Sequence, residues 1–218
     1  MRGVDVPEHG SGQGAGSGRR RPARERLLAA AARRFYADGV AATGIDAITA
    51  DAGVAKMSLY NNFSSKAELV RAYLDARHEE WLGLYRARLE RADGPREGVL
   101  AVFDAYADHA AFAYEHGFRG CGLLNAAAEL PVGDEGRDVV RAHKEEVERL
   151  IAGHLEELWP AADGPDGPRL PDRADRVRDT AEHLSFLLEG AMARAGLEGD
   201  GVRVRHARAL ASSLLDRL

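Results

Sequence analysis

The short stretch from Lys56 to Asn61 carries side chains that can read nucleic acid. The Lys56 ammonium can donate to a guanine edge or to a phosphate, and the Ser58 hydroxyl can bond to either kind of group. Met57 offers an apolar contact of the kind made with a thymine methyl, and Asn61 matches the adenine edge if it faces a groove. Held rigidly at one surface, this stretch would form a DNA-reading element.

Two short helices joined by a glycine turn are expected around this stretch. Thr43 is predicted to cap a first helix, Gly53 then turns the chain in a left-handed conformation, and a second helix runs from Lys56 to Phe63. This order is typical of a helix-turn-helix unit. Apolar side chains at helical spacing predict a shared core that keeps the unit rigid: Ile45, Ile48, Val54, Leu59 and Phe63.

Further helices are expected on both sides of this unit. Pro22 begins one that ends at Gly39, and Ser64 or Ser65 caps a long one that ends near Gly94-Pro95. The other helical stretches are 96–115, 121–130, 137–159, 173–197 and 202–218, with a flexible Pro/Gly/Asp-rich loop at 160–172. The fold class is therefore all-α with about nine helices, a three-helix DNA-binding domain followed by a helical domain.

The charge is divided unevenly along the chain. The net charge is -5, but residues 1–72 hold eleven Lys or Arg against seven Asp or Glu, a net +4, and the remainder carries -9. Residues 1–21 join a Gly/Ser tract to three arginines, which predicts a disordered basic arm, either a minor-groove contact or a leader with no role. The expected domains are this arm, a DNA-binding domain at 22–68 and an effector-binding and dimerisation domain at 69–218.

Several other classes of protein are disfavoured by the sequence. There is no phosphate-binding glycine loop and no dinucleotide fingerprint, and His78-Glu79-Glu80 lacks the second histidine of a zinc-protease helix. Cys121 with His116 or His143 could form a nucleophile and base, but structural histidines are commoner. We therefore expect no enzyme, with no catalytic residues, cofactor or metal. With neither a secretory signal nor a membrane span, a cytoplasmic protein is expected.

Residues 43–69 read TGIDAITADAGVAKMSLYNNFSSKAEL and resemble the TetR family of transcriptional regulators. The match lies in Thr43, Ile48, the Ala-Gly-Val turn at 52–54, Leu59-Tyr60, Phe63 and Ser65-Lys66 with Leu69. The family often has glycine where Met57 stands and histidine where Asn62 stands, so the groove contacts here differ locally. By this resemblance Thr43, Tyr60 and Lys66 clamp the DNA backbone. The alternative for Tyr60 is a core aromatic.

The resemblance also implies how the whole protein acts. The last two helices would pair with those of a second subunit, and a homodimeric repressor would bind a near-palindromic double-stranded operator until a small-molecule effector releases it. The apolar stripes of these helices permit this pairing, although ordinary intrachain core is the alternative. A ligand-independent architectural DNA-binding protein is a further alternative.

The stretch Phe118–Glu129 resembles the start of the central helix in a subset of the family. If helical from Cys121, it places Cys121, Asn125 and Glu129 on one face, a polar line that could border an effector cavity. The expected cavity residues are Trp81, Phe103, Tyr106, Cys121, Asn125 and Glu129, with core packing as the alternative for the aromatics. In the first turn of a helix Cys121 would favour the thiolate, so an electrophile or redox sensor is an alternative to ligand sensing.

Overall fold

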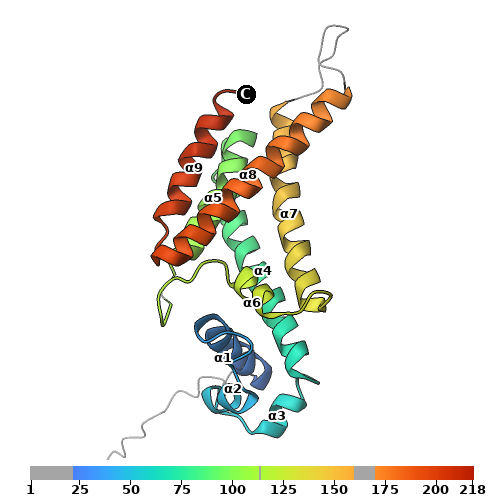
Figure 1. Ribbon diagram of the computed structural model, residues 1–218, viewed down its shortest axis with the longest axis vertical. Helices are drawn as coiled ribbons and strands as arrows, with labels where there is room; N and C mark the ends of the chain where they lie inside the picture. Colours follow the sequence, from blue (N-terminus) through green and yellow to red (C-terminus); the bar gives the residue numbers. More distant parts are fainter. Residues whose placement is uncertain (1–21, 113, 160–169) are drawn as a thin grey trace, which may run out of the picture.

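A computed structural model of the chain describes residues 22–112, 114–159 and 170–218, and it holds nine helices and no strand over these residues (Figure 1). The all-α prediction is therefore confirmed. The helices are α1 (Ala23–Ala37), α2 (Ile45–Ala52), α3 (Lys56–Tyr60), α4 (Lys66–Leu89), α5 (Pro95–Ala110), α6 (Gly122–Glu129), α7 (Glu135–Leu158), α8 (Leu170–Glu198) and α9 (Val202–Leu215). The predicted basic arm at 1–21 and most of the predicted loop at 160–172 lie outside the described residues.

Helices α1 to α3 form a small unit at one end of the molecule, which we call the head (Figure 1). Helix α4 leaves the head and continues into the larger helical part, the body, where it packs against α5 and α7. Helix α5 contacts α9, α8 contacts α7 and α9, and the short α6 lies where head and body meet. Because α4 packs on α1 at one end and on the body helices at the other, it is the continuous link between the two parts.

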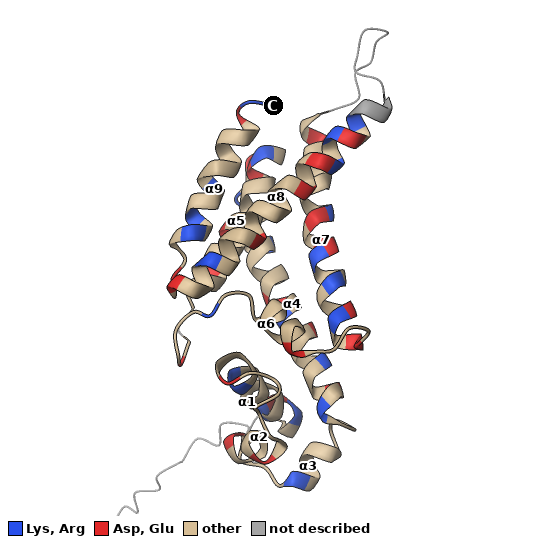
Figure 2. Cartoon of the chain, in the orientation of Figure 1, with Lys and Arg blue, Asp and Glu red and all other residues tan. Residues whose placement is uncertain are grey.

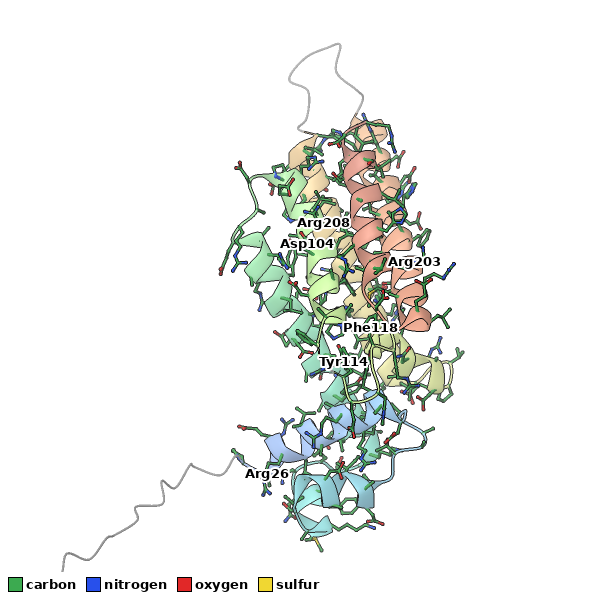
Figure 3. The ribbon with its side chains drawn as sticks, turned by 90° about the vertical axis from the view of Figure 1, so that its left-hand side faces the viewer. Arg26, Asp104, Tyr114, Phe118, Arg203 and Arg208 are labelled. Carbon is green, nitrogen blue, oxygen red and sulfur yellow. The ribbon has the colours of Figure 1, made fainter. Side chains whose placement is uncertain are left out.

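Ion pairs tie the outer helices of the body to its centre. The Nε of Arg208 on α9 lies 2.6 Å from Oδ1 of Asp104 on α5, and Figure 3 shows the two side chains facing each other. Arg96 at the start of α5 donates to Asp216 and to the Ser212 hydroxyl, 2.6 and 2.7 Å away. These half-exposed contacts set the alignment of α9 along α5, whereas buried apolar side chains supply most of the stability.

Several helix ends differ from the sequence predictions. Helix α3 ends at Tyr60 rather than Phe63, and α5 ends at Ala110 rather than Glu115 because the chain turns there and the Tyr114 hydroxyl donates 3.0 Å to the His109 carbonyl. Helix α8 begins at Leu170, within the predicted loop, and its first turn tolerates the proline of the sequence at 171. None of the described helices combines the length and apolar character needed to cross a bilayer.

Candidate nucleic-acid interface

The outer surface of α3 exposes most of the predicted base-reading side chains. Met57 is 70% exposed and Tyr60 is 48% exposed, which is far more than a core aromatic would be, so the core alternative for Tyr60 is wrong. Lys56 and Asn61 are also exposed, and Ser58 is half-buried. Helix α3 lies at the far end of the head and carries a basic, blue segment (Figure 2). A partner that covered this apolar side chain would gain from removing it from water.

The opposite side of α3 is anchored in the apolar core of the head. Ile48, Leu59 and Phe63 are at most 1% exposed, and Ile45 and Val54 pack on them partly buried. Gly53 adopts the predicted left-handed conformation with φ of 59°, and its N–H and that of Val54 donate back to carbonyls of α2. The turn therefore fixes the angle between the two helices, as the sequence predicts.

Two arginines of α1 hold α2 and the turn in place and a third packs on Phe63, and sequence reasoning identified none of them. Nη1 of Arg26 donates to the carbonyls of Ala52 and Gly53 at 2.9 and 3.0 Å, and Figure 3 labels this side chain at the end of the head. Arg34 makes a two-pronged pair with Asp51 at 2.6 and 3.1 Å. Arg24 lies 4.9 Å above the Phe63 ring. Much of the positive charge of the described head is thus used internally.

Lys56 is paired within the head. Its Nζ lies 2.8 Å from Oδ1 of Asp46 on α2, and both side chains are exposed. The hydrogen bond to Asp46 and its negative charge raise the pKa of Lys56. A base or phosphate contact by Lys56 therefore requires exchange of this solvent-exposed ion pair, which is a weak interaction in water.

Thr43 does not cap α2, so that prediction is wrong. The N-cap residue is Gly44, without a side-chain cap, and the Thr43 hydroxyl instead donates 2.6 Å to the Gly39 carbonyl. Thr43 is only 2% exposed, because its side chain closes the loop between α1 and α2 from inside. A phosphate contact by this side chain would require that bond to open, and the structure gives Thr43 the role of fixing the start of α2.

Lys66 is the first residue of α4, and hydrogen bonds between Glu68 and the two preceding serines fix the start of this helix. The Ser65 hydroxyl accepts from the Glu68 N–H at 3.1 Å, while the Glu68 carboxylate accepts from the N–H and hydroxyl of Ser64 at 2.6 Å each. Ser65 is thus the N-cap, one of the two serines predicted for this role, and together with Glu68 it forms a variant of the capping box in which the carboxylate bonds Ser64. Those hydrogen bonds to Ser64 lower the pKa of Glu68. The half-buried Lys66 therefore starts from a rigid helix end.

Comparison with known proteins identifies the same unit. The family model described as "Bacterial regulatory proteins, tetR family" matches residues 27–73. The structure of a TetR-family transcriptional regulator from Streptomyces coelicolor is 30% identical, with a TM-score of 0.75, and the match covers 89% of this chain and 95% of that one. The chain belongs to the TetR family of transcriptional regulators. It is accordingly a helix-turn-helix, DNA-binding regulator of transcription.

Curated TetR-type relatives match over shorter spans. The probable HTH-type transcriptional regulator ArpR of Pseudomonas putida is 45% identical over 86 residues, which cover 37% of this chain and 41% of ArpR. The HTH-type transcriptional activator FasR of Mycolicibacterium smegmatis is 36% identical over 110 residues, 49% of this chain and 48% of FasR. The chain thus matches less than half the length of these relatives.

In this TetR-family chain the segment between α5 and α6 ties the body to the head. Arg119 donates from Nη1 to the Tyr36 carbonyl at 2.9 Å and also to the Ala37 carbonyl, at the end of α1. The Arg119 N–H donates 2.7 Å to the Tyr36 hydroxyl. Tyr114, which Figure 3 labels with Phe118 in this segment, stacks on the Tyr36 ring at 4.3 Å. These contacts were not predicted, because they join residues about eighty positions apart.

Glu129 makes the second link between body and head. Its carboxylate at the end of α6 accepts from the backbone N–H of Val40 at 3.1 Å and of Ala41 at 2.6 Å. Gly39 precedes these residues with φ of 95°, and a Cβ added there would lie 2.6 Å from Oε1 of Glu129. We call the Glu129 contact with Val40 and Ala41 the junction clasp. It fixes the loop that leads into the helix-turn-helix.

The predicted polar line of Cys121, Asn125 and Glu129 does not border one cavity. Cys121 precedes α6 and is 7% exposed, with its Sγ 3.6 Å from Nζ of Lys144. Asn125 donates 2.9 Å to the Arg119 carbonyl, and Glu129 forms the junction clasp. The three side chains diverge because α6 begins only at Gly122, so Cys121 is not on the helix that carries the other two.

The predicted aromatic cavity residues lie in the interior of the body. Trp81, Tyr106 and Cys121 border a cavity of about 20 Å³, together with Arg77, His109, Gly122, Leu123 and His143. This volume holds about one water molecule. The Nε1 of Trp81 is buried without a hydrogen-bond partner in the described residues. Phe103 is fully buried in the core and does not border this cavity.

The histidines of this interior cluster are held neutral. Burial and the nearby cations Arg77 and Lys144 lower the pKa of His109 to about 4. Burial, Lys144 and two neighbouring histidines lower the pKa of His143 to about 2. The described residues contain no group of three or more His, Cys, Asp or Glu arranged to hold a metal ion.

Proposed function

We propose that this TetR-type regulator is a homodimeric repressor that binds a near-palindromic operator and is released by a small molecule. The DNA-binding domain is 22–68, and the effector-binding and dimerisation domain is 69–218, with α4 crossing the boundary. The observation that carries the proposal is the two-sided character of α3, anchored by Leu59 and open to solvent at Met57 and Tyr60. Such a helix is built to be covered by a partner, and in this family the partner is DNA.

The proposed contacts divide into two kinds. Lys56, Met57, Ser58 and Asn61 would meet base edges in the major groove, while Tyr60 and Lys66 would clamp phosphates on either side. Phosphate contacts position a protein, and base contacts specify the sequence. The Thr43 contribution is indirect, through the loop that its hydroxyl closes.

The proposed dimer surface is the face shared by α8 and α9. Phe186 is 66% exposed and Leu210 is 47% exposed, and both border a shallow hollow of about 320 Å³ with Leu187, Gly190, Ala191 and Ala207. Large exposed apolar side chains beside small residues suit the close approach of two more helices. Helix α8 crosses the body diagonally from α7 to α9 (Figure 1), and it packs against α9. A two-fold dimer would place its two heads roughly 34 to 36 Å apart.

The effector part of the proposal rests on the interior cluster around Trp81, Tyr106 and Cys121. Its unpartnered Trp81 N–H and its aromatic walls are features of a ligand pocket, but about 20 Å³ admits no effector. Effector binding there must therefore open the body, and α4, which carries Trp81 inside the body and Lys66 as its first residue, would pass that movement to the head. The buried Cys121 does not favour the thiol-sensor alternative.

The experiment is titration of the purified protein against the DNA upstream of its own gene. We expect a preference of about a thousandfold or more over random DNA, and lower transcription from that promoter in a reconstituted assay. Equal affinity for random DNA would support an architectural DNA-binding protein and overturn the operator proposal. Raised transcription would overturn the repressor part alone. Operator affinity that is indifferent to every small molecule bound by the body would overturn the release step.

A further inference from the structure

A groove with a volume of about 780 Å³ lies where head and body meet. Its walls come from the loop after α1, the first turns of α4, the end of α6 and the start of α7. This volume is within the roughly 300 to 1,000 Å³ of small-molecule sites, which occur preferentially between domains. The interior cavity of the body is far smaller, so in this structure the groove is open to a ligand that the interior excludes.

The groove combines apolar walls with an excess of carboxylates. Its apolar residues are Val40, Ala41, Ala67, Val70 and Leu130, and its charged residues are Lys66, Glu68, Arg71, Glu129, Asp134 and Glu135. These four carboxylates exceed the two cations by two charges. Arg71 is paired with Glu135 at 3.6 Å. The charge balance therefore favours a cation, and the apolar walls favour one with hydrocarbon attached.

The carboxylates of the groove hold backbone N–H groups in this structure. Glu129 accepts from Val40 and Ala41 in the junction clasp, and Asp134 accepts from the Gly136 N–H at 2.8 Å. The Glu129 side chain is exposed, so an ammonium could approach its carboxylate from the groove. The two N–H groups use only two of the roughly four acceptor positions of the carboxylate, so an ammonium can bind to the same oxygens. A bound cation would share the negative charge of Glu129 with the two N–H groups and so weaken the junction clasp.

We propose that this groove binds a small amphipathic cation, an ammonium carried on an apolar group, with the charge at Glu129 and the apolar part against Val70 and Leu130. The site is separate from the interior cluster. Because the ligand would contact head and body at once and weaken the junction clasp, its binding lowers operator affinity. This last consequence rests on the proposed function, whereas the binding itself does not.

The test uses the full chain without DNA and 4-phenylbutylamine as the probe. Calorimetry should show about tenfold tighter binding of the amine than of 4-phenylbutanol, and weaker binding still of 4-phenylbutyrate. Glu129→Gln should weaken amine binding about tenfold. Asp134→Asn should weaken it less and keep the fold, because asparagine also caps a helix. Glu90→Gln, an exposed residue outside the groove, is the matched control and should change nothing.

Equal affinities for amine and alcohol would overturn the proposal, as would amine binding that survives both Glu129→Gln and Asp134→Asn. Loss of amine binding in Tyr106→Phe but not in Glu129→Gln would place the ligand in the interior and overturn it too. With a known operator, the amine should lower its affinity at least threefold in the wild type and not in Glu129→Gln. Amine binding without this effect would overturn the regulatory step alone.

Discussion

At the residue scale, the head separates side chains that can contact DNA from side chains that hold the reading surface. Arg26 donates hydrogen bonds to the carbonyls of Ala52 and Gly53, and Arg34 donates to the carboxylate of Asp51. Lys66, in contrast, has no ion pair among the described residues, whereas Lys56 is bound to Asp46. The cations of the head therefore differ in how readily they can bind a DNA phosphate and so release a counterion from the DNA.

Lys66→Ala should weaken binding to all DNA sequences alike. We expect the slope of log K against log salt to fall by about one, because one phosphate contact is lost. Lys56→Ala or Ser58→Ala should instead change the preference at particular base pairs, by about 1–3 kcal/mol each. Arg91→Ala, an exposed change outside the head, is the control. The measurement is affinity for operator variants across salt concentrations. If Lys66→Ala lost affinity only for particular base pairs, Lys66 would not be a phosphate contact and the division into phosphate and base contacts would be wrong.

His109 should make the protein sensitive to acid. Its pKa is lowered to about 4 by burial and by Arg77 and Lys144, whereas an unfolded histidine titrates near 6.5. Between these values the unfolded chain binds the proton and the folded chain does not. Stability therefore falls as pH drops from about 6.5 towards 4, by about 1.4 kcal/mol per pH unit for one such histidine, and is regained as pH rises.

The measurement is urea unfolding from pH 4 to 8. His109→Gln, which can keep a hydrogen bond to Tyr114, should reduce the slope of unfolding free energy against pH by about one proton. His116→Gln, at an exposed position between α5 and α6, is the control. A wild-type slope that persists in His109→Gln would show that another group is responsible.

At the scale of elements, turns and caps decide where the helices of the head point. Gly53 needs its left-handed conformation, and a Cβ there would meet only Nη1 of Arg26, at 3.7 Å. The space for a side chain exists, so the requirement for glycine is one of backbone conformation. The capping box at Ser65 and Glu68 sets the start of α4 in the same local way.

Gly53→Ala should lower the free energy of unfolding by about 1–2 kcal/mol, because a Cβ disfavours left-handed φ and ψ. Any relaxation of the turn would tilt α3, so operator affinity should fall as well. Gly83→Ala is the matched control, since Gly83 lies inside α4 with nothing within 4 Å of an added Cβ. That change should stabilise the protein by about 0.5–1 kcal/mol. Chemical denaturation measures the free energy of unfolding of both variants. If Gly53→Ala and Gly83→Ala changed it in the same direction, the argument for a left-handed requirement at Gly53 would be contradicted.

At the scale of the whole molecule, head and body are coupled through α4, Arg119 and Glu129. The latter two reach across the junction to the end of α1 and the loop after it. The body in turn presents an apolar face at α8 and α9. The end of α8 also packs closely on the backbone of Arg119 and Gly120, so the helices of this face are linked to the junction.

Phe186→Asp combined with Leu210→Glu should produce a folded monomer. Both side chains are at least 47% exposed in the single chain, so the charges cost little there, whereas burying them unpaired in an interface costs several kcal/mol. Sedimentation velocity measures the mass, and circular dichroism checks the helices. Val132→Asp, at a 92% exposed position between α6 and α7, should leave the dimer intact. If the double variant remained dimeric, the face of α8 and α9 would not be the dimer interface.

The sequence by itself determined the helices, the helix-turn-helix and the core of the head. Ile48, Leu59 and Phe63 are buried as their spacing predicts, and Gly53 and Ser65 act at the ends where their types place them. These features follow from helical periodicity and local backbone preferences, which act over a few residues.

Only the tertiary structure decided which distant groups meet. Thr43 faces inward to Gly39 instead of capping α2, Cys121 and Glu129 belong to different surroundings, and Glu129 joins the loop at Val40 some 89 positions away. Such contacts depend on the angles at which helices cross and on the exact residue where each begins. Periodicity along a sequence fixes the face of a helix but neither of those quantities, so the junction and its groove emerge only when the helices are packed.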